Sequence, residues 1–136
     1  TTTRGKSLII VDDDKVLNSL IKKYIEKNFP SIKVFQAFDG FEAGSLMAKE
    51  RPGLVLLDLD LPGVDGFSLC KKIKRDVMFK NPFIVVITAL KDVDLAEKVS
   101  DLGSNYFLTK PLNMEQVGAI VNQWVGMATD KANDES

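Results

Sequence analysis

The sequence predicts a three-layer α/β sandwich, with a parallel five-stranded sheet between two layers of helices. Three observations support this class. Short runs rich in valine, isoleucine and leucine alternate with stretches of helical periodicity along the chain. The connections between them are short, which favours parallel strands joined by right-handed crossovers. Three of the runs are apolar nearly throughout, as strands are when helices cover both faces of their sheet.

The apolar runs are short and rich in β-branched residues, which is typical of strands. SLIIV, GLVLL and FIVVIT are continuous, whereas IKVFQA alternates between apolar and polar residues. In chain order we predict strands at residues 7–11, 32–37, 53–57, 83–88 and 105–109.

The stretches that follow the strands space their apolar residues as helices do. In chain order we predict helices at residues 12–29, 39–50, 65–77, 92–103 and 113–126. Pro52 ends the second helix and Gly103 the fourth. The residues expected to face inward from the first, third and last helices are Val16, Leu17, Leu20, Ile21, Tyr24, Ile25, Phe67, Cys70, Ile73, Val77, Met114, Val117, Ile120, Val121 and Trp124.

The chain of 136 residues suits one domain with a single core. We expect that domain at 6–127, after an N-terminal extension at 1–5. Residues 128–136 are polar and lack periodicity, so an irregular tail is expected there. We find no apolar run of membrane-spanning length and no signal peptide, so we expect a cytoplasmic protein without membrane contact.

The composition excludes several kinds of chemistry. Histidine is absent and cysteine occurs once, so Ser–His and Cys–His catalysis and zinc clusters are excluded. Cys70 falls in an apolar helical pattern and is expected to be a small core residue. A net charge of −1 argues against direct binding of nucleic acid, and the run KKIKR is read as a solvated helix face.

Polar residues gather where four of the predicted strands end. The carboxyl ends of parallel strands meet at one edge of a sheet, where sites form in this class of fold. The residues that follow the first, third, fourth and fifth strands there are Asp12, Asp13, Asp14, Asp58, Asp60, Thr88, Ala89, Lys110 and Pro111.

This set of side chains suits phosphoryl chemistry with a hard cation. Crowded carboxylates repel one another, and a divalent cation relieves that repulsion. Oxygen ligands without histidine or cysteine favour Mg²⁺ or Mn²⁺. Lys110 and Thr88 supply a charge and a hydroxyl for phosphoryl oxygens. Asp58, at the end of the central strand, is the preferred nucleophile.

Helix capping is the alternative explanation for some of these acids. Asp14 and Asp65 each precede a helix and are more simply explained as N-caps. Asp12 and Asp13 also stand at a helix start, but two adjacent acids exceed what one cap needs.

With these residues in place, the chain resembles the receiver domain of two-component response regulators. The motifs IIVDDD, LVLLDLDLPGVDGF, VVITA and GSNYFLTKPL carry the resemblance over about 6–127. It implies a flavodoxin-like (βα)5 sandwich with strand order 2-1-3-4-5. It also implies that Asp58 accepts the phosphoryl group and belongs to the metal site with Asp12, Asp13 and Asp60. In that site Asp13 would bind Mg²⁺ directly, Asp12 often through water, and Asp60 through its main-chain carbonyl.

The resemblance assigns the remaining strand-end residues to phosphoryl binding and switching. Lys110 would pair with the phosphoryl group, and Thr88, followed by Ala89, would move toward it. Phe107 would then turn inward, by packing alone because it has no hydroxyl. Pro111 would follow Lys110 through a cis peptide bond.

The implied function is that of a phosphoacceptor in a phosphorelay rather than a turnover enzyme. A histidine kinase or histidine phosphotransfer protein would donate to Asp58, and the acyl phosphate would be lost by slow autodephosphorylation. The signal would leave through the surface of the fourth predicted helix (92–103), the fifth strand (105–109) and the fifth helix (113–126). That surface would meet an output domain or effector protein or form a homodimer.

Two other hypotheses stay open at the level of sequence. The pair Asp58 and Asp60 also resembles the nucleophile and acid/base of haloacid-dehalogenase-type phosphatases, although it follows the third strand rather than the first. A receiver fold retained only as a binding module is the second. Asp60 is itself unusual for a receiver, and its carboxylate would place added charge near a phosphate on Asp58.

Overall fold

The computed structural model describes residues 6–89, 97–98, 101 and 103–135, with side chains up to residue 127. The extension predicted at 1–5 and most of the helix predicted at 92–103 lie outside the described residues. Gly103, predicted to end that helix, is described and has a φ of 80°. Such a backbone conformation suits glycine, because a side chain there would be strained.

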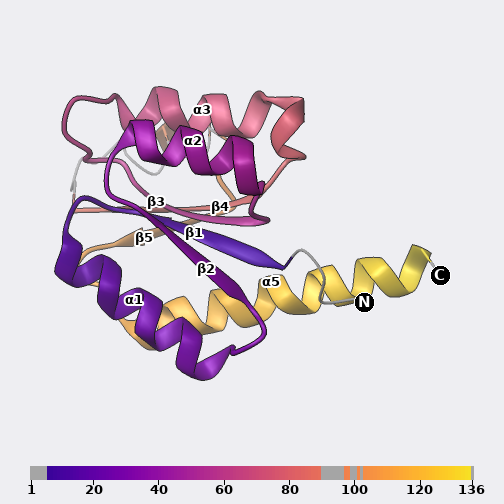
Figure 1. Ribbon diagram of the computed structural model, residues 1–136. Helices are drawn as coiled ribbons and strands as arrows, with labels where there is room; N and C mark the ends of the chain where they lie inside the picture. The colour runs from indigo at the N-terminus through magenta and orange to yellow at the C-terminus, as the bar shows by residue number, and fades with distance from the viewer. Residues whose placement is uncertain (1–5, 90–96, 99–100, 102, 136) are drawn as a thin grey trace.

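Five parallel strands form one sheet in the order β2-β1-β3-β4-β5, which confirms the predicted fold class (Figure 1). Each strand lies within one residue of its predicted bounds at either end. The strands are β1 (Ser7–Val11), β2 (Lys33–Ala37), β3 (Leu54–Asp58), β4 (Phe83–Thr88) and β5 (Tyr106–Thr109).

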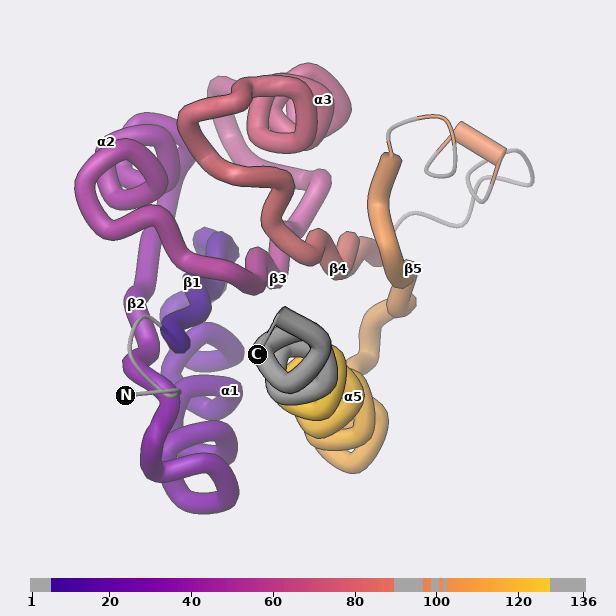
Figure 2. Tube along the Cα trace, turned by 90° about the vertical axis from the view of Figure 1, so that its right-hand side faces the viewer, coloured from indigo at the N-terminus to yellow at the C-terminus, as the bar shows by residue number. Residues whose placement is uncertain are grey.

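Helices cover both faces of the sheet. The helices α1 (Lys15–Asn28) and α5 (Met114–Glu135) lie on one face, and α2 (Gly40–Glu50) and α3 (Gly66–Arg75) lie on the other (Figures 1 and 2). A short 3-10 helix, η1 (Val77–Phe79), follows α3. The sheet therefore separates two hydrophobic cores.

Alternation along the strands divides the buried side chains between these cores. In β1, Ile9 and Val11 pack with residues of α2 and α3, whereas Leu8 and Ile10 pack with residues of α1 and α5. Every residue of β1 and of β3 is buried. These two strands are thus the centre of the molecule, and their carboxyl ends hold the next residues of the chain at a fixed edge of the sheet.

Three predicted core positions prove to be exposed. Val16 and Leu20 of α1 face solvent because the buried line of that helix is Asn18, Ile21 and Ile25. Val77 is exposed because α3 ends at Arg75 and Asp76 adopts an extended conformation. The helical register that would have carried Val77 inward is broken at that residue.

The last helix is longer than expected. The irregular tail predicted from residue 128 is wrong, because α5 continues to Glu135. No proline or glycine follows Gly126, and Ala, Lys and Glu are good helix formers, so nothing in the sequence stops the helix there. Among the described residues, no helix is both long and apolar enough to cross a membrane.

A buried asparagine ties α1 to the carboxyl edge of the sheet. Asn18 is fully buried, and its Nδ2 donates to the carbonyls of Asp12 (3.0 Å), Ala37 (3.2 Å) and, more weakly, Ile10 (3.4 Å). Its Oδ1 accepts a hydrogen bond from Gln36 Nε2 at 3.0 Å. One side chain therefore holds together the ends of β1 and β2 and the turn that begins at Asp12.

Replacing Asn18 with alanine is expected to lower the free energy of unfolding by about 2–3 kcal/mol, because buried carbonyls lose their donor. Urea denaturation followed by circular dichroism measures the change. Asn28→Ala is the matched control on the same helix, since the Asn28 side chain is exposed and donates to the Tyr24 carbonyl within one turn. Equal losses for the two variants would show that the network contributes no special stability.

Cys70 is expected to be unreactive in the native protein. Its side chain is fully buried in the core under α2 and α3, and burial raises the pKa of its thiol to about 11. The thiolate needed for attack is thus scarce at neutral pH. Labelling with an aromatic disulfide reagent should be slow until denaturant unfolds the chain, and rapid labelling without denaturant would contradict this.

Candidate functional site

Two buried carboxylates and one lysine form the centre of the carboxyl edge. Asp12 follows β1 and Asp58 ends β3, and each is 2% exposed. Lys110, which follows β5, places its Nζ 3.0 Å from Asp12 Oδ2 and 3.0 Å from Asp58 Oδ2. The side chain of Lys110 is 21% exposed, so the cation lies at the mouth of the site.

Main-chain pairing brings these three residues together from distant parts of the chain. The register of β1 on β3 pairs Val11 with Leu57, so the residues that follow them stand side by side. The Asp12 N–H donates to Ala37 O at 3.1 Å. On the other side, the Lys110 N–H donates to Thr88 O at 2.9 Å and extends the pairing of β5 with β4.

The charges at this edge perturb one another. Burial raises the pKa of Asp12, the repulsion from Asp58 adds to that rise, and bonds from Asp14 N–H and Lys110 oppose it. Burial alone would lower the pKa of Lys110, but its pairing with Asp12 and Asp58 outweighs burial and raises it. The protonated form of Lys110 is therefore stabilised, whereas the ionised form of Asp12 is destabilised by its burial.

Short turns orient the two buried carboxylates. Asp12 Oδ1 accepts from the Asp14 N–H at 2.9 Å, and Asp58 Oδ1 accepts from the Asp60 N–H at 2.9 Å. In both cases the chain makes a tight turn, in which a main-chain N–H donates to the carboxylate of the aspartate two residues before it. The Oδ2 atoms are thereby left to face Lys110, and each carboxylate has a defined orientation.

The structure separates the capping acids from the site acids. Asp14 is the N-cap of α1 and accepts from the N–H groups of Val16 and Leu17. Asp65 is the N-cap of α3 and accepts from the Phe67 N–H and the Ser68 hydroxyl. Both bonds lower the pKa of Asp65, and the bond from the Ser68 hydroxyl has the larger effect. Capping is therefore the role of both residues, as the alternative explanation held.

The remaining acids could hold a hard cation. Oxygen atoms of Asp12, Asp13 and Asp58 lie within 4.8 Å of one another. Asp12 Oδ2 is buried and is held by its ion pair with Lys110 Nζ at 3.0 Å, without a well-aligned hydrogen bond. Three carboxylates with one buried oxygen left without a well-aligned hydrogen bond fit a Mg²⁺ or Mn²⁺ ion. The exposed Asp13 and Asp60 stand on the solvent side, and the Asp60 side chain is not part of this cluster.

The other strand-end residues surround this centre. Thr88 is fully buried at the end of β4, next to the exposed Ala89. Phe107 is partly buried against the core under α2 and α3, three residues before Lys110. The Lys110–Pro111 peptide bond is cis, as predicted.

Asn18, whose bond to the Asp12 carbonyl supports the site, was not predicted from the sequence. A signal was present, since Asn18 stands between Leu17 and Ile21 in a stripe that was read as inward-facing. A polar residue at a core position of a helix is normally buried only with its hydrogen bonds satisfied. That pattern pointed to a buried network, although not to its partners.

Known proteins share this fold and these motifs. A family model described as the response regulator receiver domain matches residues 8–122. The signal receiver domain of a DNA-binding response regulator from Colwellia psychrerythraea 34H superposes with a TM-score of 0.84 at 31% identity, covering 89% of this chain and 98% of that one.

The chain matches one curated relative over nearly its whole length and another over about half. The chain is 29% identical over 126 residues to sporulation initiation phosphotransferase F of Bacillus subtilis, covering 93% of this chain and 98% of that protein. It is 33% identical over 114 residues to the DNA-binding dual master transcriptional regulator RpaA of Synechocystis sp., covering 84% of this chain but 46% of that protein. The chain thus spans about half the length of that regulator. Because the family model covers most of its length, the chain belongs to the response regulator receiver domains, which are signalling domains.

Proposed function

We propose that this domain accepts a phosphoryl group on Asp58 from the phosphohistidine of a histidine kinase or histidine phosphotransfer protein. The N–P bond of the donor breaks as a carboxylate oxygen of Asp58 forms the new O–P bond. The observation that carries the proposal is the buried Asp58 carboxylate, 3.0 Å from Lys110 and beside the acids Asp12 and Asp13. The chain has no histidine, so the donor is another molecule or another domain.

The chain's own residues have separate tasks in this transfer. Lys110 neutralises charge that the incoming phosphoryl oxygens bring, in the way that preorganised cations stabilise such transfers. Asp12 and Asp13 hold the metal, with Asp60 contributing its main-chain carbonyl. Mg²⁺, when bound, screens the repulsion between the phosphoryl oxygens and the carboxylates. Slow hydrolysis of the acyl phosphate returns the domain to its starting state.

The phosphorylated state is read out through a switch. Thr88 and Ala89 shift toward the phosphoryl group, and Phe107 packs into the space that this movement leaves. The change reaches the surface formed by the helix expected at residues 92–103, β5 and α5, where an output domain, an effector or a second copy of the domain binds. Lys110, Pro111 and Phe107 share one short segment, which supports a link between the charge and this surface.

A relay role is supported by similarity along almost the whole of a phosphotransferase. Binding of DNA, as in the name of the Synechocystis regulator, would need a further domain, and the receiver itself is proposed to bind no nucleic acid. The phosphatase hypothesis has weaker support, because the partners of the Asp58 carboxylate are Lys110 and the Asp60 main chain.

Asp58→Asn is expected to abolish phosphorylation while the fold is kept, because the amide is nearly isosteric but not nucleophilic. The measurement is incorporation of label from acetyl [³²P]phosphate with Mg²⁺, with circular dichroism as the check on folding. Wild type should gain one phosphoryl group that hydroxylamine removes.

Asp60→Asn is the matched control for that experiment. The Asp60 main chain, rather than its exposed carboxylate, contacts Asp58. This variant should therefore still be labelled. Label on the folded Asp58→Asn variant at the wild-type level would refute the assignment of Asp58.

Mg²⁺ is expected to stabilise the folded protein, by about 1.4 kcal/mol at ten times its Kd, or a few degrees in Tm. Asp13→Asn should lose this shift. Without Mg²⁺ its Tm should be no lower than that of wild type, because one of three repelling charges is gone.

Asp14→Asn serves as the control, since asparagine caps a helix as aspartate does. It should retain the Mg²⁺ shift, and NaCl at matched ionic strength should not reproduce that shift. A shift in Asp13→Asn equal to that of wild type would contradict the role of Asp13.

A further inference from the structure

A groove of about 460 Å³ lies between α2 and α3, on the face of the molecule opposite α1 and α5. Small residues of α2, Gly44 and Ala48, form one wall, and Leu69 and Ile73 of α3 form the other. Met78 in η1 closes one end. The groove thus runs between two helices that share one hydrophobic core beneath it.

Large apolar side chains at both ends of the groove are exposed to solvent. Phe41, at the start of α2, is 85% exposed, and Met78 is 52% exposed. Val77, next to Met78, is exposed as well. Apolar side chains gathered around a hollow, rather than scattered singly, mark a contact surface.

The glycine in the middle of α2 is not required by the protein's own packing. A Cβ at Gly40 would lie 2.5 Å from Val64, so glycine is needed at that position. A Cβ at Gly44 would meet nothing within 4 Å, because it would point into open space. Glycine weakens a helix interior relative to alanine. Gly44 therefore keeps the groove open at a cost to the helix.

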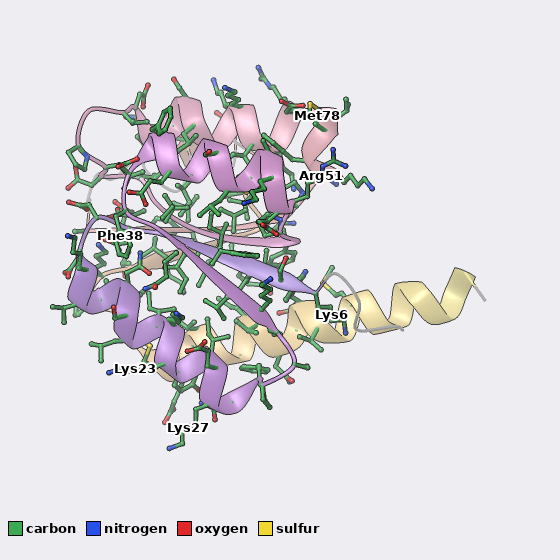
Figure 3. The ribbon with its side chains drawn as sticks, viewed as in Figure 1. Lys6, Lys23, Lys27, Phe38, Arg51 and Met78 are labelled. Carbon is green, nitrogen blue, oxygen red and sulfur yellow. The ribbon has the colours of Figure 1, made fainter. Side chains whose placement is uncertain are left out.

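The edges of the groove are positively charged. Lys72 lines it. Lys49 and Arg75 are exposed and are each next in the chain to a lining residue. Arg51 and Met78 lie at the same end of the α2 and α3 layer (Figure 3). The one acid in the lining, Asp76, accepts from the Met78 N–H at 3.0 Å and keeps its negative charge. Lys72 and the neighbouring Lys49, Arg51 and Arg75 thus outnumber this acid, and the excess charge at this end of the groove is basic.

We propose that this groove binds an amphipathic helix of a partner protein, with apolar anchors facing α2 and α3 and acidic residues on its flanks. Helices bind in grooves of this kind through anchors spaced three or four residues apart. The basic edges select acidic flanks and disfavour a second copy of the domain, whose own basic edge would face the first. The site is separate from Asp58 and does not rest on the phosphoacceptor role.

A display library of helix-forming 16-residue peptides is the probe. Peptides retained by the wild-type domain should carry leucine or phenylalanine at helical spacing with flanking Asp and Glu. Amide shifts in NMR spectra of the domain with the best peptide should be confined to residues 40–48 and 69–79. Asp58→Asn should bind that peptide as wild type does, so this result is independent of phosphorylation.

Two substitutions of one residue separate binding from folding. Gly44→Leu fills the groove and should weaken the peptide at least tenfold while raising Tm, because leucine favours the helix. Gly44→Ala should also raise Tm but leave the affinity within about threefold, since a methyl group does not fill the hollow. Charge reversal by Lys72→Glu with Arg75→Glu should weaken the acidic peptide and not its lysine-substituted counterpart.

Three outcomes would overturn the proposal. One is the absence of any retained peptide whose binding is lost in Gly44→Leu. Another is equal retention of basic peptides. The third is a dimer of the free domain, seen by light scattering, that Gly44→Leu dissociates, because the occupant would then be a second copy.

Discussion

The ion pairs of Lys110 with Asp12 and Asp58 are the interaction on which the carboxyl edge depends. Two buried carboxylates side by side would be costly without a compensating charge. The cation comes from the segment after the edge strand β5, 52 residues beyond Asp58. One side chain thus joins the end of β3 to the residues that follow β1 and β5. The Asp12 oxygen in this ion pair, Oδ2, has no well-aligned hydrogen bond, and it is the oxygen that would contribute to binding a divalent cation.

Hydrogen bonds to the main chain also hold the residues around these charges in place. Turns at Asp12 and Asp58 orient both carboxylates, and Asn18 fixes the Asp12 carbonyl from within the core. The site is therefore rigid on the β1 and β3 side. In the proposed mechanism, a phosphoryl group on Asp58 adds negative charge that Lys110 must also neutralise. The segment that contains Phe107 and Lys110 is the part that moves in response. The groove between α2 and α3 lies on another face, so the domain has room for a contact that does not depend on phosphorylation.

Particular residues show where prediction from sequence succeeded and where it failed. The strands β1, β3 and β4 were predicted to within a residue because continuous apolar runs are typical of strands buried on both faces. Val16 and Leu20 were misplaced because periodicity alone cannot tell which side of a broad apolar stripe meets the sheet, and Asn18, not an apolar residue, took the inward position. Val77 was misplaced because the extended Asp76 ends α3. The helical continuation of α5 was missed because polar composition was taken as irregular structure.

By itself, the sequence determined the alternation of strands and helices, the exclusion of histidine and cysteine chemistry, and the acids, threonine and lysine that follow the strands. These are properties of short stretches, and local pattern carries them. Only the tertiary structure decided that Lys110 meets both Asp12 and Asp58, that Asn18 bonds to carbonyls from two strands, and that α2 and α3 leave a groove. Each of these depends on contacts between segments far apart in the chain, where strand register and helix packing set the distances.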